Sequence, residues 1–116
     1  MVQIQVRKLL SQIKLDFDNI AYQELKKRVD FIKKDKIVQF IEIYQSTSLD
    51  GYHLYVTTNK ELSFIEKMPY RKKWRDDGQR IVMDLLKDDE KLKDVLFSYR
   101  MKKGKIINRI FIERVA

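Results

Sequence analysis

The sequence has few of the residues that build disulfides, thiolate metal sites and flexible linkers. It contains no cysteine, one histidine, one proline and three glycines in 116 residues. The lack of cysteine excludes a disulfide framework and thiolate zinc sites, and a single histidine leaves carboxylates as the main ligands of any metal site. Magnesium and manganese ions prefer such oxygen ligands. Either ion is therefore the expected metal cofactor.

Membrane and secretion signals are also missing. No apolar run is long enough to span a bilayer, and the N-terminus lacks the apolar core and cleavage site of a secretory signal. The sequence therefore predicts a cytoplasmic protein with no membrane partner. There is no repeat, low-complexity tract or linker, and a chain of this length suffices for one hydrophobic core. We expect a single domain over residues 1–116.

Charged residues, by contrast, are abundant. They make up 36% of the chain, and 25 Lys and Arg against 17 Asp and Glu give a net charge of +8. A basic balance favours a polyanionic partner, either nucleic acid or nucleoside triphosphates, although a basic surface that only keeps the protein soluble explains it equally well. The densest run of positive residues lies at 67–75 and could contact a phosphate backbone, although the solvent-exposed end of a helix explains it almost as well. The predicted nucleic-acid contacts in that run are Arg71, Lys72, Lys73 and Arg75.

Hydrophobic periodicity predicts the secondary structure. Alternating apolar and polar residues indicate strands, and apolar residues three or four apart indicate helices. A polar loop at 46–51 separates two strands of a β-hairpin, and Asp76-Asp77-Gly78 indicates a turn. The predicted elements are a strand at 13–18, a helix at 19–34, strands at 37–44 and 52–57, a helix at 58–68 that Pro69 ends or kinks, and a strand at 81–85.

This β-α-β-β-α-β order predicts an α+β fold of the ferredoxin-like, or RRM-like, type over residues 13–86. Such a fold has an antiparallel sheet with helices on one face and the other face open. A helix at 88–95 and a β-hairpin between 96 and 115 would form an extension over residues 87–116. If the apolar strand residues face the helices, pleat alternation sends a group of polar residues to the open face. These are Asp16, Asp18, His53, Tyr55 and Asp84.

Two groups of residues in these segments could take part in chemistry. Asp16 and Asp18 point the same way from one strand, and with Asp84 they could hold the divalent ions that serve nucleotidyl transfer. The alternative is that Asp18 caps the first helix and Asp16 is an ordinary surface residue. In the hairpin, the Ser48 hydroxyl, the Gly51 backbone and the His53 imidazole could grip phosphates, although a lone strand histidine is commonly structural.

These segments together resemble the catalytic palm of the archaeo-eukaryotic primases and primase-polymerases. Residues 13–18 are similar to that family's hydrophobic strand ending in Asp-x-Asp, residues 48–53 to its Ser…Gly-x-His hairpin, and residues 81–84 to its later strand with a third acidic residue. The resemblance covers about Ile13 to Leu86. It implies Asp16, Asp18 and Asp84 as catalytic metal ligands for magnesium or manganese, and Ser48, Gly51 and His53 as the nucleotide-binding residues.

The chain is too short for the second subdomain that catalytic members of this family normally pack against the palm. We therefore expect one of three things: a minimal primase-like nucleotidyltransferase in DNA replication, a palm completed by a partner subunit or a second copy, or a degenerate palm that binds nucleotides or nucleic acid without polymerising. Two alternatives lie outside the family. One is a non-catalytic RRM-like module that stacks bases on Phe40, Tyr44 and Tyr55. The other is a structural or interaction protein of a small virus or plasmid.

Overall fold

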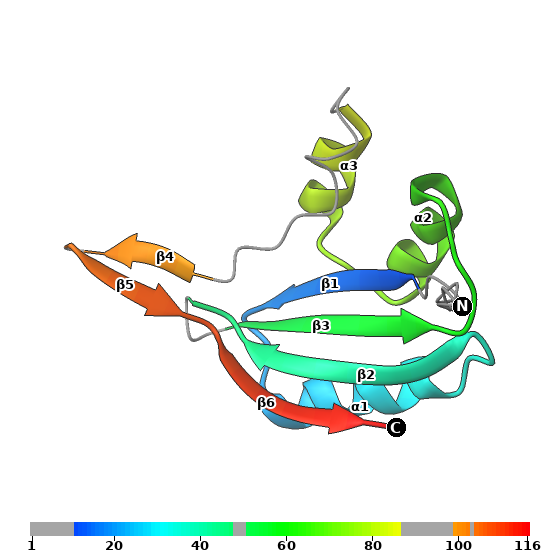
Figure 1. The fold of residues 1–116 in the computed structure, drawn as a ribbon, viewed down its shortest axis with the longest axis horizontal. Helices are drawn as coiled ribbons and strands as arrows, with labels where there is room; N and C mark the ends of the chain where they lie inside the picture. Colours follow the sequence, from blue (N-terminus) through cyan, green and yellow to red (C-terminus); the bar gives the residue numbers. More distant parts are fainter. Residues whose placement is uncertain (1–10, 48–50, 87–98, 103) are drawn as a thin grey trace, which may run out of the picture.

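The computed structural model describes residues 11–47, 51–86, 99–102 and 104–116. Its main unit is a four-stranded antiparallel sheet with the strand order β1-β3-β2-β6 (Figure 1). In the described part of the chain, no helix combines the length and the apolar character needed to cross a membrane. The elements are β1 (Gln12–Asp18), α1 (Tyr22–Lys33), β2 (Val38–Gln45), β3 (Gly51–Thr58), α2 (Phe64–Lys73), α3 (Gly78–Leu86), β4 (Tyr99–Lys102), β5 (Lys105–Asn108) and β6 (Ile110–Val115).

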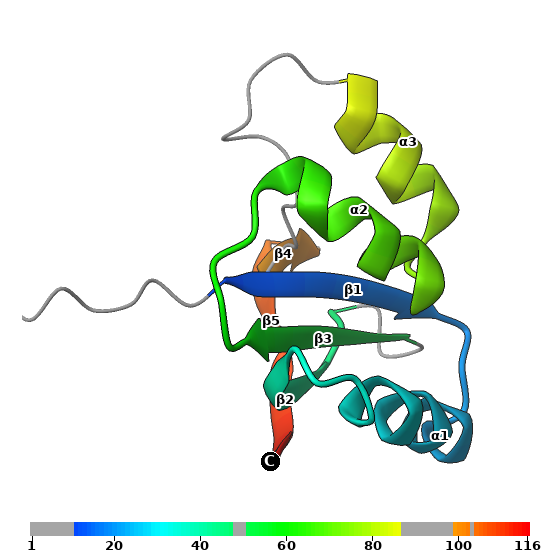
Figure 2. The ribbon, with the colours of Figure 1, turned by 90° about the vertical axis from the view of Figure 1, so that its right-hand side faces the viewer.

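The sheet has one covered face and one open face. Helix α1 lies behind the sheet in Figure 1, and no helix of the described residues lies over the face turned to the viewer. Helices α2 and α3 lie along the β1 edge of the sheet (Figure 2). The predicted α+β class, with an antiparallel sheet and one open face, is therefore confirmed.

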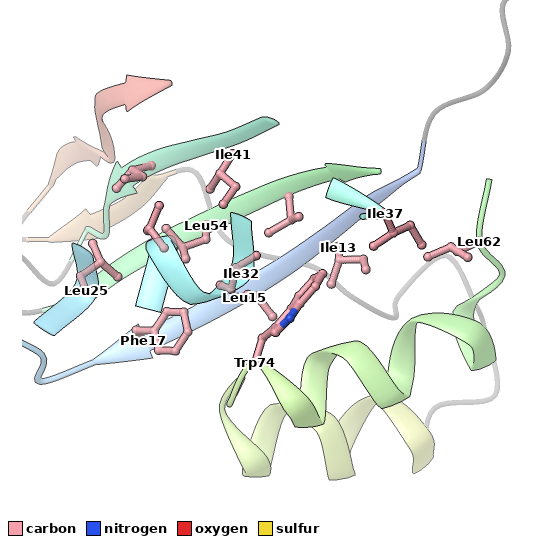
Figure 3. Packing of buried hydrophobic residues seen from close by; sticks show 13 residues of the cluster. Ile13, Leu15, Phe17, Leu25, Ile32, Ile37, Ile41, Leu54, Leu62 and Trp74 are labelled. Atoms are coloured by element: carbon pink, nitrogen blue, oxygen red, sulfur yellow. The ribbon is translucent and has the colours of Figure 1, made fainter. Parts of the chain in front are cut away.

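The hydrophobic core fills the covered face. In β1 the side chains of Ile13 and Leu15 are fully buried, as expected for a strand with one face toward the core. Trp74, which follows α2, reaches into the same cluster from the β1 edge (Figure 3). The other buried members of the cluster are Phe17, Leu25, Val29, Ile32, Ile37, Ile41, Ile43, Leu54, Val56 and Leu62.

The predicted hairpin is confirmed and forms the centre of the sheet, because β3 pairs with β2 on one side and with β1 on the other. The start of α2, however, differs from the prediction. Thr58 still belongs to β3, and Ser63 and Glu66 form the capping box that begins α2. Pro69 lies inside the helix, which runs on to Lys73.

The predicted strand at 81–85 is wrong, because these residues belong to helix α3. The helix places Asp84 beside the buried side chain of Arg71, with Arg71 Nη1 2.9 Å from Asp84 Oδ2. A strand would not bring Asp84 back to α2. The fourth strand of the sheet is β6, which lies beside β2 and not beside β1, where the ferredoxin-like unit has its last strand. The predicted helix at 88–95 lies outside the described residues.

The C-terminal β-hairpin is confirmed in part. Strands β4 and β5 pair as a separate two-stranded sheet, with Lys102 opposite Lys105. Gly104 between them has φ of 75°, a left-handed conformation that favours glycine. The rest of the predicted hairpin forms β6, which joins the main sheet through β2. The main sheet therefore extends beyond residue 86.

Candidate metal and nucleotide site

Three carboxylates meet at the end of β1. Asp16 and Asp18 both point to the open-face side of the strand, as the sequence predicted, and Asp77 comes from the turn between α2 and α3. One carboxylate oxygen from each residue lies within 4.8 Å of the other two. Oxygen atoms at this spacing, drawn from two distant segments of the chain, can share one divalent cation.

Asp18 does not serve as the cap of the following helix. Helix α1 begins at Tyr22, and its N-cap residue, Ala21, makes no side-chain cap. The structure therefore removes the capping explanation for Asp18 that the sequence left open.

An open pocket of about 480 Å³ surrounds the carboxylates. Asn19 and Arg75 have φ angles of 51° and 61°, and they are the two non-glycine residues with positive φ among those the structure describes. Such conformations persist where the surrounding structure imposes them, and they are frequent at functional sites. Both residues line the pocket, together with Arg28.

Asp76 holds the two halves of the site together. Its Oδ1 accepts hydrogen bonds from the backbone N–H of Asp16 and from that of Asp77, each at 2.8 Å. One carboxylate oxygen thus connects β1 to the turn that carries the third carboxylate. Asp76 is buried, so it acts as a positioning residue.

A buried guanidinium holds Asp76 in turn. The side chain of Arg71 is 0% exposed, and its Nε donates to Asp76 Oδ2 at 2.6 Å while its Nη1 donates to Asp84 Oδ2. Arg80 Nη1 also donates to Asp76 Oδ2 at 2.6 Å and to the Lys14 carbonyl at 2.9 Å. This network joins α2 and α3 to β1.

The network corrects two predictions. Asp84 does not join Asp16 and Asp18, because its side chain is 3% exposed and is paired with Arg71 in the interior. Arg71 lies too deep to contact nucleic acid. The other predicted contacts, Lys72, Lys73 and Arg75, are exposed; the Lys73 ammonium lies 3.2 Å from Asp35 Oδ2.

The electrostatics of Asp16 favour a cation. Burial, reinforced by the nearby charges of Asp18, Asp76 and Asp77, raises the pKa of Asp16 to about 6, against the lowering effect of Arg80. Its Oδ1 is buried and has no hydrogen-bond partner among the described residues. A buried acceptor that is crowded by like charges gains from a positive ligand.

His53 lies directly across the sheet from Asp16. The two residues are paired in the β1–β3 register, and His53 Nε2 is 3.7 Å from Asp16 Oδ1. Burial, helped by Arg109 and Arg80, lowers the pKa of His53 to about 4, so the imidazole is neutral at pH 7 and the two groups form no ion pair. The predicted nucleotide-binding histidine therefore adjoins the carboxylates as a neutral donor or acceptor.

Gly51 lies against the Asp18 carboxylate. A Cβ atom there would lie 2.7 Å from the Phe17 carbonyl oxygen and 2.8 Å from Asp18 Oδ1, so the close approach of β3 to β1 requires glycine. Ser48, the remaining predicted nucleotide contact, lies outside the described residues.

Sequence reasoning missed Asp77 and the positioning role of Asp76. The signal available was the pair of adjacent aspartates in a predicted turn after a basic segment. Comparisons of the chain with protein-family models, curated proteins and solved structures return no match. The resemblance to primase palms therefore rests on the residues themselves.

Proposed function

We propose that this protein binds a divalent metal ion through Asp16, Asp18 and Asp77 and, with it, the phosphates of a nucleoside triphosphate, as a primase-type palm does. The observation that carries the proposal is the approach of the three carboxylates to within 4.8 Å of one another. Asp16 and Asp18 are the Asp-x-Asp pair of the primase-like strand, and Asp77 takes the place expected of Asp84.

The residues present fit magnesium or manganese. All three ligands are carboxylate oxygens, and Asp16 Oδ1 has an unmet hydrogen-bonding capacity. A bound ion would neutralise phosphate charge and activate an attacking hydroxyl group. In nucleotidyl transfer, the hydroxyl oxygen would bond to the α-phosphorus while its proton passes to solvent, the bond from the α-phosphorus to the α–β bridging oxygen would break, and pyrophosphate would leave.

Arginine side chains and His53 would bind the rest of the nucleotide. Arg28 and Arg75 line the pocket that holds Asp16, Asp18 and Asp77, so they can pair with phosphate oxygens that the carboxylates repel. The neutral imidazole beside Asp16 can accept or donate one hydrogen bond to the bound nucleotide. The described residues contain one core, so the second subdomain that catalytic primases pack against the palm would have to come from a partner subunit or a second copy.

The metal site is tested by thermal unfolding with and without Mn²⁺. A ligand that binds only the native state stabilises it by about 2.7 kcal/mol when present at 100 times its Kd. We expect Mn²⁺ to raise the Tm of the wild type and to leave that of Asp18→Asn unchanged. Asp30→Asn, an exposed change on α1, is the matched control and should respond as the wild type does. Equal responses of all three proteins would refute the site.

Nucleotide binding is tested by calorimetric titration of ATP in the presence of Mn²⁺. We expect binding that disappears with a chelator, in Asp18→Asn and in Asp77→Asn. Weaker binding in Arg75→Ala, with the Mn²⁺ response preserved, would place the phosphates in the pocket. A protein that binds Mn²⁺ but gives no heat with any nucleoside triphosphate would keep the metal site and exclude the nucleotide.

A further inference from the structure

A surface of aromatic and arginine side chains lies on the open face, next to the carboxylates. The strand register sets Tyr44 of β2 opposite His53 and Phe111 of β6 opposite Tyr44. A row of side-chain positions therefore crosses all four strands, from Asp16 through His53 and Tyr44 to Phe111. Figure 1 looks onto this face, and the described helices leave it uncovered.

Aromatic rings in and beside this row contact one another, and arginine guanidinium groups lie over their faces. The Tyr44 ring lies 5.4 Å from the Tyr55 ring and 5.3 Å from the Phe111 ring, both edge to face. The Arg109 guanidinium lies 4.2 Å above Tyr44 and 4.5 Å above Tyr55, and it donates a hydrogen bond to the Tyr55 hydroxyl. Arg114 covers the Phe40 ring in the same way, at 4.3 Å. Cation–π contacts of this kind hold the guanidinium groups against the aromatic rings.

We propose that the open face binds single-stranded nucleic acid, with bases stacked on the Phe111 ring and on the Arg109 guanidinium that covers Tyr44. Phe111 is 51% exposed and so offers a free ring surface. Aromatic rings and guanidinium planes both stack on unpaired bases, and arginines also neutralise the phosphates between them. A protein with a net charge of +8 attracts such a strand from a distance.

The row also gives the strand a direction. Bases placed on Phe111 and on the Arg109 guanidinium above Tyr44 lead across His53 to Asp16, where the metal-binding pocket begins. This part of the proposal rests on the proposed function, because it makes the strand a substrate of the same site. The binding itself does not, because none of the stacking residues is a carboxylate ligand. A duplex would bind less well, because its bases are already stacked on one another.

The experiment is a fluorescence anisotropy titration of labelled oligo(dT) in a chelating buffer. We expect Phe111→Ala to weaken binding by at least about fivefold, the effect of losing one stacked base. Phe31→Ala is the matched control, because Phe31 is a similarly exposed phenylalanine, 49%, on α1 at the other face of the sheet. Arg109→Ala should also weaken binding and reduce its salt dependence more than Lys34→Ala, which removes one exposed charge from the α1 side.

The outcomes separate this proposal from the metal site. Asp18→Asn should bind oligo(dT) as well as the wild type or better, because it removes a negative charge. The proposal is overturned if the wild type does not bind oligo(dT), if Phe111→Ala and Phe31→Ala behave alike, or if duplex DNA binds as tightly as the single strand. Concentration-dependent dimerisation that Phe111→Ala abolishes, without oligonucleotide binding, would instead assign the face to a protein contact.

Discussion

Asp16 and His53 face each other across β1 and β3 with pKa values displaced in opposite directions, and burial is the main cause for both. Burial disfavours the charged form of each side chain, so the sheet, and not an attraction between charges, holds the two residues together. A metal ion would reverse this for Asp16 by stabilising the carboxylate. The two residues therefore fit a site that is completed by a ligand.

The opposite pKa shifts of Asp16 and His53 predict a pH dependence of the unfolding free energy, which substituting one residue at a time would reveal. Folded Asp16 has a raised pKa, so its contribution to stability is present below about pH 4 and is lost as the pH rises through about 6. Folded His53 has a lowered pKa, so its contribution is present above pH 6.5 and is lost as the pH falls through about 4. In the wild type the two trends offset each other over this range.

We expect the unfolding free energy of Asp16→Asn, measured by urea denaturation with a chelator, to rise between pH 4 and pH 6.5. The unfolding free energy of His53→Gln should fall between pH 4 and pH 6. Both changes should be about 1 to 2 kcal/mol relative to the wild type. Curves that run parallel to the wild-type curve would show that the two groups titrate normally in the folded protein.

Among the secondary-structure elements, the sequence correctly predicts strands that bury one face and expose the other. Every second side chain of residues 13–18 is buried in the core cluster, which explains the alternation, and the structure confirms the strand there. Residues 81–85 alternate as well, yet they form α3, in which Val82 and Met83 are exposed. Their apolar pattern is compatible with either element, and the tertiary pairing of Asp84 with Arg71 accompanies the helix.

The Arg71 network is expected to be essential for the arrangement of α2, α3 and β1. Removing one partner from a buried ion pair leaves an uncompensated charge, which costs about 3 to 5 kcal/mol. Arg71→Met should therefore lose stability on that scale in urea denaturation, because Asp76 and Asp84 stay buried. Lys72→Met, an exposed neighbour on α2, should change stability by less than about 0.5 kcal/mol.

The same variant tests the positioning role of Asp76. Because Asp76 holds the backbones of Asp16 and Asp77, Arg71→Met should also weaken the Mn²⁺ response at a temperature where it remains folded, and Lys72→Met should not. An unchanged Mn²⁺ affinity in folded Arg71→Met would show that Asp76 keeps its place without the guanidinium.

In the molecule as a whole, two of the three carboxylates of the candidate site could be predicted from the sequence and the third could not. Asp16 and Asp18 follow from strand alternation alone, since residues two apart on a strand share a face. Asp77 enters the site because α2 packs along the β1 edge and Trp74 fills the core there, which is information that no local pattern contains. The aromatic row likewise depends on β6 joining β2, a pairing between residues that are distant in the chain.

The pocket and the aromatic row lie on the same sheet, so we expect binding of a ligand at one to change the affinity for a ligand at the other. If a strand on the open face reaches Asp16, its phosphates will share the metal ion, and Mn²⁺ should tighten oligo(dT) binding. By thermodynamic linkage, oligo(dT) must then tighten Mn²⁺ binding by the same factor, typically about 5- to 150-fold for coupled sites. Anisotropy titrations at several Mn²⁺ concentrations, and Mn²⁺ titrations with and without oligo(dT), measure the two factors independently.

In Asp18→Asn, Mn²⁺ can only screen the phosphates, so added Mn²⁺ should weaken oligo(dT) binding slightly, as a salt does. Tighter binding in the wild type together with weaker binding in this variant would place the strand at the carboxylates. Weaker binding in both proteins would mean that the open face and the pocket serve separate ligands. The strand would then end before it reaches Asp16, and the two surfaces would be linked only by the fold.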